Sequence, residues 1–247
     1  MIKEKNMIFG LRAVIEAVEA GKDIDKIFIR RELGGNLAKE LYEKIRPLEI
    51  PVQRVPLEKL NRLTMKNHQG VVAFLSSITY HDITTLIPTI YEEGKTPFIV
   101  VLDGVTDVRN FGAIARTCEC AGVNALLVPA HRAAAANADA IKTSAGALHT
   151  LPVCRTENLE KAVKFLKDSG LKIVCVSEKA GKNFKQEDYN SPLALVLGAE
   201  DIGISPEILK HADTKVSIPI LGKIQSLNVS VAAGIVIYQA VEGKCKM

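Results

Sequence analysis

The feature that most constrains the fold is an alternation, from Pro97 onward, of short apolar segments with longer segments of helical character. Five segments are continuously apolar, as strands buried on both faces of a sheet are: 98–105, 125–129, 172–177, 193–198 and 215–220. Helices are expected between and after them, over 112–122, 138–148, 157–170, 205–212 and 227–243. This order predicts an α/β fold with a mostly parallel sheet, in which ligands gather at the carboxyl ends of the strands.

The first 80 residues predict a separate, small α/β module. Helical patterns cover 11–21, 36–46 and 57–64, and strand patterns cover 26–30, 47–55 and 71–77. Residues 81–96 are predicted to link this module (1–80) to a second domain (97–247), with a short helix over 86–92 as one option. The module holds 14 Lys and Arg against 10 Asp and Glu, whereas the rest of the chain holds 18 of each. This excess either indicates a polyanion-binding module or arises by chance.

Several function classes are disfavoured. No apolar run reaches the roughly 18 residues of a membrane span, and the first residues lack the apolar core of a signal peptide, so a cytoplasmic protein is expected. The five cysteines are odd in number, and no Cys/His cluster has metal-ligand spacing, so neither a disulfide framework nor a metal site is expected. The absence of GxGxxG and GxxxxGK[ST] disfavours ordinary NAD or ATP chemistry.

Three polar, glycine-bearing loops follow predicted strands and are the places to seek chemistry. They contain Asp103 to Asn110, Gly198 to Gly203, and Pro219 to Asn228. Each could bind a ligand through glycine and backbone amides before a helix, or could simply turn the chain and cap that helix. Arg116 is harder to explain structurally, because a guanidinium does not suit its small, apolar helical surroundings.

Together, the three loops resemble the three motifs of the SpoU family of RNA ribose 2′-O-methyltransferases, a family of knotted enzymes. The matching residues are Asp103, Asp107, Asn110, Gly112 and Arg116, then Gly198, Glu200 and Gly203, then Ile218, Pro219, Ser226, Leu227, Asn228, Val229 and Ser230. In the front module, FGLRAVIEAV and HQGVVA resemble the ribosomal-protein-like RNA-binding module that is fused to many of these enzymes. The resemblance therefore covers nearly the full chain.

The resemblance implies a trefoil knot at the carboxyl end, S-adenosylmethionine as cofactor and a homodimer that completes each active site. Without it, an unknotted sheet would be expected, because knots are nearly absent from proteins. It assigns the cofactor pocket to Leu197, Gly198, Ala199, Ile218, Ser226 and Leu227, and the acceptor ribose to Asn110, Arg116, Glu200 and Asn228.

The chemistry implied is attack of a ribose hydroxyl on a sulfonium methyl group, which needs alignment and removal of one proton. The family account makes Arg116 the activating group. A guanidinium stays protonated, however, so we expect Arg116 to hold a phosphate and polarise the hydroxyl rather than to act as a base. Glu200 is either the proton acceptor or a loop anchor. Asp201 follows Glu200 where the family often has glycine, so this loop could be placed differently.

The front module points to a ribosomal RNA substrate, specifically a guanosine of the large-subunit RNA or a pre-ribosomal particle, because the transfer-RNA relatives lack it. Its candidate phosphate contacts are Arg12, Arg30, Arg31, Arg54, Arg62 and Lys66, with Lys22 and Lys26. Aromatic residues are 5% of the chain and Trp is absent, which favours recognition of RNA shape and phosphate over base stacking. The alternatives are the same reaction on transfer RNA or another ribosomal position, or a silent RNA-binding assembly protein. Neither DNA nor a membrane is an expected partner.

Overall fold

A computed structural model describes residues 7–48 and 50–242. The chain divides after Thr79 into two compact units, each considered by itself. The first unit contains a four-stranded sheet in the order β1-β4-β2-β3, with β2 and β3 parallel and the other neighbours antiparallel. The strands are β1 (Met7–Phe9), β2 (Ile24–Arg30), β3 (Val52–Val55) and β4 (Val71–Leu75).

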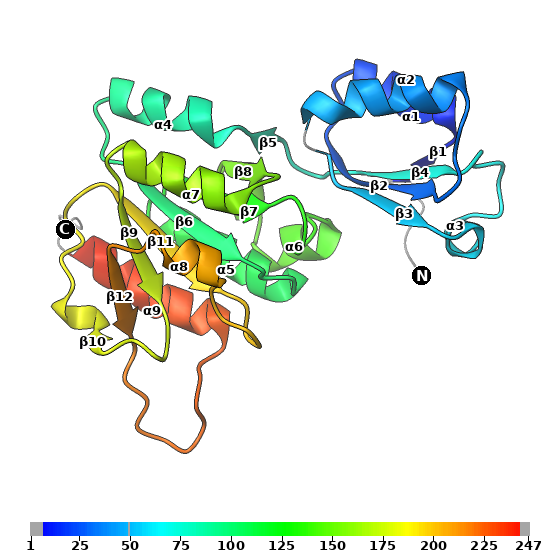
Figure 1. The fold of residues 1–247 in the computed structure, drawn as a ribbon. Helices are drawn as coiled ribbons and strands as arrows, with labels where there is room; N and C mark the ends of the chain where they lie inside the picture. Colours follow the sequence, from blue (N-terminus) through cyan, green and yellow to red (C-terminus); the bar gives the residue numbers. More distant parts are fainter. Residues whose placement is uncertain (1–6, 49, 243–247) are drawn as a thin grey trace. The chain divides into compact units, whose positions relative to one another are not determined.

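Helices cover the two faces of this small sheet unequally. Helices α1 (Leu11–Glu19) and α2 (Asn36–Ile45), the latter continued by the 3-10 turn η2 (Arg46–Leu48), bury their apolar sides on one face (Figure 1). On the other face, the short helix α3 (Leu57–Leu63) packs through Leu60 against Phe28, Val55 and Val72. The predicted small α/β module is therefore present.

The two front motifs meet at one end of this sheet. The amide of Gly10 donates to the carbonyl of Val71 at 3.1 Å, and the amide of Leu11 donates to the side-chain Oε1 of Gln69 at 3.1 Å. Gln69, which holds the left-handed φ of +50°, thus caps the start of α1. His68 is buried, and its Nδ1 accepts from the amide of Gly70 at 3.0 Å. Within this unit, HQG therefore fixes the backbone around α1.

The second unit is an eight-stranded sheet in which every described pair is parallel, in the order β10-β12-β9-β11-β6-β7-β8-β5. Its strands are β5 (Tyr80–His81), β6 (Phe98–Asp103), β7 (Ala125–Pro129), β8 (Val153–Thr156), β9 (Lys172–Val176), β10 (Lys182–Asn183), β11 (Leu193–Gly198) and β12 (Thr214–Ser217). All five predicted strands are present, and the sheet is wholly rather than mostly parallel. The strand β8 and the two-residue strands β5 and β10 were not predicted from the sequence.

Helices cover both faces of this sheet (Figure 1). One side carries α4 (Ile83–Glu92), α7 (Leu159–Asp168) and α8 (Pro206–Leu209), which share a core with the strands. The other side carries α5 (Val108–Cys120), α6 (Ala138–Thr143) and α9 (Val229–Val241). Further 3-10 turns are η3 (Ala147–His149) and η4 (Phe184–Gln186). In the part of the chain that the structure describes, no helix combines the length and apolar character needed to cross a bilayer.

Two boundaries differ from the prediction. Residues 80–92, expected within a linker or at its border, form β5 and α4, and α4 buries Ile83, Ile87 and Ile90 in the second unit. The expected linker is therefore largely part of that unit, because three isoleucines at helical spacing give α4 an apolar side. Helix α5 begins at Val108 rather than near Gly112, because Asp107 caps it and Asn110 does not.

A buried carboxylate fastens the segment between β9 and β11. The Glu187 side chain is only 1% exposed. Its carboxylate accepts hydrogen bonds from Nζ of Lys172, at the start of β9, and from Nζ of Lys182, on β10, the second at 2.8 Å. Burial by itself raises the pKa of Glu187, but the hydrogen bonds and charges of the two lysines outweigh it and hold the pKa below its ordinary value. The segment is therefore held by an ion pair of one carboxylate with two lysines.

Candidate active site

The three glycine-bearing loops converge at the carboxyl edge of the large sheet. β6 and β11 are neighbours, with Gly198 opposite Asp103 in the register. The Oδ2 atom of Asp103 accepts a hydrogen bond from the amide of Ser205 at 2.7 Å, which joins the first loop to the second. Parallel neighbouring strands thus bring together residues that are about a hundred positions apart.

Three of the four residues predicted to face the acceptor ribose form a closed hydrogen-bonded ring. Oε1 of Glu200 accepts from Nδ2 of Asn110 at 3.0 Å, from Nδ2 of Asn228 at 2.8 Å and from the amide of Val229 at 3.3 Å. The same Nδ2 of Asn228 lies 3.0 Å from Oδ1 of Asn110. Within the described residues, Oε2 of Glu200 has no hydrogen-bond partner, so it can accept one from a substrate hydroxyl.

Helix caps hold the two asparagines of this ring. Asp107 Oδ1 accepts from the amides of Arg109 and Asn110, which starts α5 and places Asn110 in its first turn. Asn228 is the cap of α9, where its Oδ1 accepts from the amide of Ser230 at 2.9 Å. Its Nδ2 remains free to donate into the ring. Asn228 therefore serves as cap and site residue at once.

Arg116 is not part of this ring. It lies on α5, is exposed to solvent, and lines neither of the two pockets described below. The expectation that Arg116 faces the same site is therefore not met within this chain. The next residue, Thr117, faces α9, because its Cγ2 lies 4.0 Å from where a Cβ on Gly234 would stand. Arg116 itself lies on the solvent-exposed surface of α5.

A first pocket, called the Gly198 pocket, lies on one side of Glu200. Its walls contain all six residues predicted to hold the cofactor: Leu197, Gly198, Ala199, Ile218, Ser226 and Leu227. The remaining lining residues are Val176, Ser177, Glu178, Glu200, Gly203, Ile220, Val229 and Ala232. Ser177 and Glu178 were not predicted as site residues, although Ser177 is the last residue of a predicted strand at the same sheet edge and Glu178 follows it.

Gly198 has a steric reason to be glycine. A Cβ there would lie 2.2 Å from the carbonyl carbon of Gly203 and 2.3 Å from the amide nitrogen of Ile204. This close approach accompanies a tight turn in which Ala199 and Gly203 exchange both backbone hydrogen bonds, at 2.9 and 3.2 Å. The left-handed φ falls on Gly203 and not on Asp201. Asp201 therefore fits the turn, and its Oδ1 accepts from the next amide at 2.9 Å.

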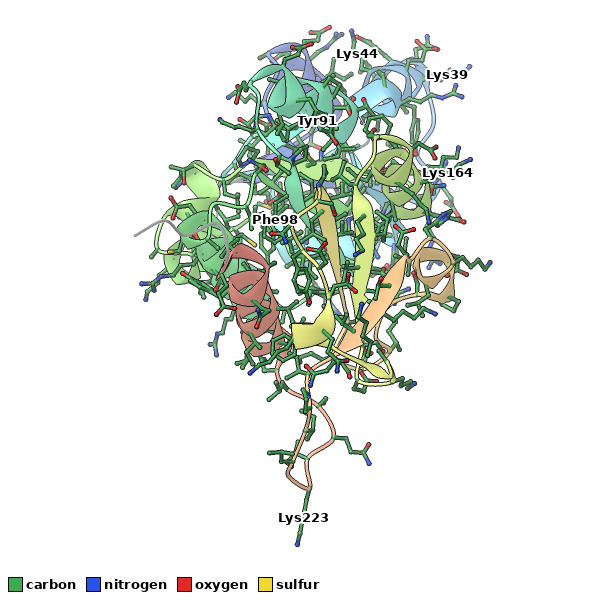
Figure 2. All side chains as sticks on the ribbon, turned by 90° about the vertical axis from the view of Figure 1, so that its left-hand side faces the viewer. Lys39, Lys44, Tyr91, Phe98, Lys164 and Lys223 are labelled. Carbon is green, nitrogen blue, oxygen red and sulfur yellow. The ribbon has the colours of Figure 1, made fainter. Side chains whose placement is uncertain are left out.

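Residues at both ends of the third loop line the Gly198 pocket, whereas the middle of the loop extends far from the rest of the unit. Figure 2 shows Lys223 at the tip of this loop, in which Leu221 is 99% and Ile224 77% exposed. Ile218 before the tip and Leu227 after it both line the pocket.

A second pocket, the Asn110 pocket, lies on the other side of Glu200. It is lined by Gly104, Val105, Thr106, Asp107, Asn110, Ala199, Glu200, Asp201 and Val229. Ala199, Glu200 and Val229 line both pockets. Two ligands that occupied the two pockets would therefore meet beside Glu200.

Comparison with known proteins identifies the family of this chain. Residues 97–238 match the SpoU rRNA Methylase family, and residues 7–81 match the RNA 2′-O ribose methyltransferase substrate-binding family. The chain belongs to the SpoU family. Similar proteins named as TrmH family tRNA/rRNA methyltransferases occur in Bacillus subtilis, 31% identical over 97% of this chain and 96% of the relative, and in Staphylococcus saprophyticus, 33% identical over 96% and 95%.

Solved structures agree with this assignment. The SpoU methyltransferase AviRb of Streptomyces viridochromogenes, crystallised with AdoMet, has a TM-score of 0.60 at 25% identity and covers 96% of this chain and 90% of its own. An AdoMet-bound rRNA methyltransferase of Sinorhizobium meliloti shares the fold, with a TM-score of 0.63 at 23% identity over 98% and 88%. This SpoU chain is therefore an RNA 2′-O-ribose methyltransferase, and S-adenosylmethionine (AdoMet) is its methyl donor.

The Gly198 pocket fits this cofactor. Val176, Ile218, Leu227 and Ala232 offer apolar surface for an adenine ring, and the exposed backbone at Gly198 allows close approach. The Glu178 and Glu200 carboxylates can accept hydrogen bonds from ribose hydroxyls or the amino group, and their charge suits a sulfonium. When bound, the cofactor supplies an electrophilic methyl group.

Proposed function

We propose that this enzyme methylates the ribose 2′-hydroxyl of a guanosine in large-subunit ribosomal RNA, with the cofactor in the Gly198 pocket and the acceptor ribose in the Asn110 pocket. The observation that carries this arrangement is the position of Glu200 on the shared wall of both pockets. A hydroxyl held there can donate to Oε2 of Glu200 while its oxygen faces the neighbouring pocket. Glu200 thus orients the hydroxyl and accepts its proton.

The front unit supports ribosomal RNA over transfer RNA as the substrate. Residues 7–81 match a family named for substrate binding, and the neighbouring match is to a family named for rRNA. A tRNA-modifying TrmH/SpoU enzyme of A. aeolicus, 34% identical with a TM-score of 0.55, covers only 66% of this chain and 85% of its own. A ribosomal substrate also implies that the enzyme works in the cytoplasm. The knot implied by the family resemblance stays a prediction.

Four of the proposed phosphate contacts belong to one end of the small sheet. Arg30 is the last residue of β2 and Arg31 follows it, Arg12 lies in the first turn of α1, and Lys66 precedes β4. All four are exposed, and the same end carries the capped start of α1. Arg62 and Arg54 are also exposed, but the Arg54 guanidinium lies 5.7 Å from the ring of Tyr42 on the face covered by α2.

We further propose a homodimer in which Arg116 acts on the site of the partner subunit. Helix α9 is apolar on nearly all sides, yet Val231 and Tyr238 on it are half exposed. Arg116 lies on the exposed surface of α5, a helix that packs against α9, and outside the pockets of its own chain. If a partner's α9 covers this surface, Arg116 lies next to that partner's site. Because a guanidinium group has no acceptor for a proton, its part is to hold a phosphate or polarise the hydroxyl.

Mass analysis of the methylated nucleoside tests the reaction. The purified protein is incubated with isotopically labelled S-adenosylmethionine and ribosomal RNA from a strain that lacks its own gene, and the RNA is digested to nucleosides. Labelled 2′-O-methylguanosine is the expected product. Another ribose-methylated nucleoside would replace guanosine as the target, and methylation of transfer RNA alone would refute the ribosomal assignment. No methylated RNA together with no binding of S-adenosylmethionine would favour the silent assembly protein.

Mixing two inactive variants tests the dimer. Arg116→Ala and Glu200→Ala are each expected to be inactive as purified proteins. After subunit exchange, half of the dimers are mixed and each has one complete site, so about a quarter of the wild-type activity should return. Absence of recovery despite exchange, shown by light scattering and native mass spectrometry, would place Arg116 in the site of its own chain.

A further inference from the structure

One arginine outside the family motifs lies against the wall of the Asn110 pocket. Arg132 belongs to the loop between β7 and α6, and its Nη2 atom is 4.0 Å from the point where a Cβ on Gly104 would stand. Gly104 lines the pocket and has no side chain to separate the guanidinium from a bound ligand. Arg132 is exposed and makes no ion pair with a described carboxylate.

The loop that carries Arg132 is fastened on both sides of it. The amide of Ala134 donates to the carbonyl of Val105, in the pocket wall, at 3.0 Å, and the amide of Ala130 donates to that of Thr156 at 2.8 Å. Between these anchors Arg132 holds a φ of +59°, a left-handed conformation that costs a side-chain-bearing residue free energy. The anchored backbone therefore places the guanidinium at Gly104 at the expense of local strain.

The charges around the Asn110 pocket show why a cation is needed there. Its lining residues include three carboxylates, those of Asp107, Glu200 and Asp201, and no lysine or arginine. A polyanion that delivers a ribose into the pocket therefore meets repulsion unless a cation lies close by. The adjoining pocket between α5 and α6 has Arg109 and Lys142, but these are matched by the carboxylates of Asp107 and Asp139.

We propose that Arg132 binds the RNA phosphate next to the reacting ribose and thereby positions the acceptor nucleotide. A guanidinium suits this role, because its fork of N–H donors can hold two phosphate oxygens at once and stays charged at every working pH. The inference rests on the proposed function, since it assumes that the ribose occupies the Asn110 pocket. It assigns Arg132 to the substrate and leaves the cofactor to the Gly198 pocket.

Two substitutions separate the guanidinium from the backbone that carries it. Arg132→Gly removes the side chain and leaves a residue that adopts a positive φ without strain, so the loop should keep its shape. Arg132→Lys keeps the charge but loses the fork. Lys164→Ala, on the exposed side of α7, is the matched control for loss of one surface cation (Figure 2).

The measurements are the KM for transcribed large-subunit ribosomal RNA, the salt dependence of RNA binding by filter assay, and calorimetric affinity for S-adenosylmethionine. We expect Arg132→Gly to raise the RNA KM by about 10- to 100-fold, as loss of a charged hydrogen bond does, with Arg132→Lys in between. The slope of log K against log salt should become shallower by about 0.7 to 0.9, the value for one phosphate. Lys164→Ala should match the wild type.

Three results would overturn the inference. They are an unchanged RNA KM in Arg132→Gly, an unchanged salt slope, and a loss of S-adenosylmethionine affinity, which would place Arg132 at the cofactor. The salt slope is measurable whether or not methyl transfer occurs. A wild-type protein that binds RNA but methylates none would therefore refute the proposed function, while the slope would still decide the role of Arg132.

Discussion

Gly198→Ala is the substitution whose effect the geometry fixes most directly. The added methyl group would lie 2.2 Å from the carbonyl carbon of Gly203 and 2.5 Å from its oxygen. Carbon atoms in contact prefer about 3.5 to 4.0 Å, so the backbone would have to move by roughly 1 Å or more. The neighbouring atoms are backbone, which cannot rotate away as a flexible side chain can. The turn that carries Glu200 must therefore shift.

Two contributions set the size of the effect. Overpacking in a tightly packed site costs about 1–3 kcal/mol, and weakening the two hydrogen bonds between Ala199 and Gly203 adds about 1 kcal/mol for each bond lost. We therefore expect the free energy of unfolding to fall by about 2–5 kcal/mol. Gly198, Ala199 and Gly203 all line the cofactor pocket, so the affinity for S-adenosylmethionine should fall by at least about tenfold.

Urea unfolding and calorimetric titration with S-adenosylmethionine measure these two quantities. Gly181→Ala is the matched control, because Gly181 has an ordinary φ and a Cβ there would meet nothing within 4 Å. This control should keep the wild-type affinity and be neutral or more stable by up to about 1 kcal/mol. A Gly198→Ala variant with wild-type stability and cofactor affinity would refute the argument from close approach.

Three further predictions concern single side chains. Glu200→Gln keeps a side-chain oxygen that can accept the hydrogen bonds of the ring but loses the carboxylate that accepts the proton. The kcat should therefore fall by about 10²- to 10⁴-fold, while the affinity for the cofactor is kept. An unchanged kcat would show that Glu200 only anchors the loop. Because the pKa of Glu187 is lowered in the folded state, its carboxylate should stabilise the fold at pH values above the unfolded-state pKa of about 4.3. This stabilisation should be lost as the pH falls through the lower pKa of the folded state. Glu187→Gln should therefore lower stability by about 1–3 kcal/mol at pH 7 and less at pH 3, as urea midpoints would show. Gln69→Ala leaves the Leu11 amide uncapped and should cost the first unit about 1 kcal/mol by the same assay.

The elements of the large sheet could be predicted because local patterns determine them. Buried parallel strands are continuously apolar, and the strands of five or six residues in this sheet, which are β6, β7, β9 and β11, have that pattern over at least four consecutive positions. β8 (Val153–Thr156) escaped notice because it has only four residues, of which Val153 and Cys154 are fully buried. Short strands at a sheet edge, such as β5 and β10, or next to one, such as β8, are specified by their neighbours, and a local pattern does not contain that information.

Apart from Arg116, the residues that gather at the candidate site could be named from the sequence, but the contacts between them could not. Glu200 lies 90 positions from Asn110 and 28 from Asn228, and no local rule states that one carboxylate oxygen receives both amides. The resemblance to the family motifs singled out these three residues, whereas the contacts between them depend on the order of the strands in the sheet. Arg116 shows that a motif position alone does not predict a pocket residue, because Arg116 lies outside the two pockets of its own chain.

The sequence left open whether the polar residues of the loops cap helices or form a site, and the structure shows that these roles are coupled. Asn228 uses Oδ1 to start α9 and Nδ2 to reach Glu200, so the cap fixes the direction of the donor. Asp107 starts α5 and thereby sets Asn110 in the first turn, facing the same carboxylate. A side chain held at a helix start loses little further freedom when it binds a ligand, which favours both the affinity and the alignment that methyl transfer requires. The same hydrogen bonds that begin two helices therefore preorganise the acceptor site.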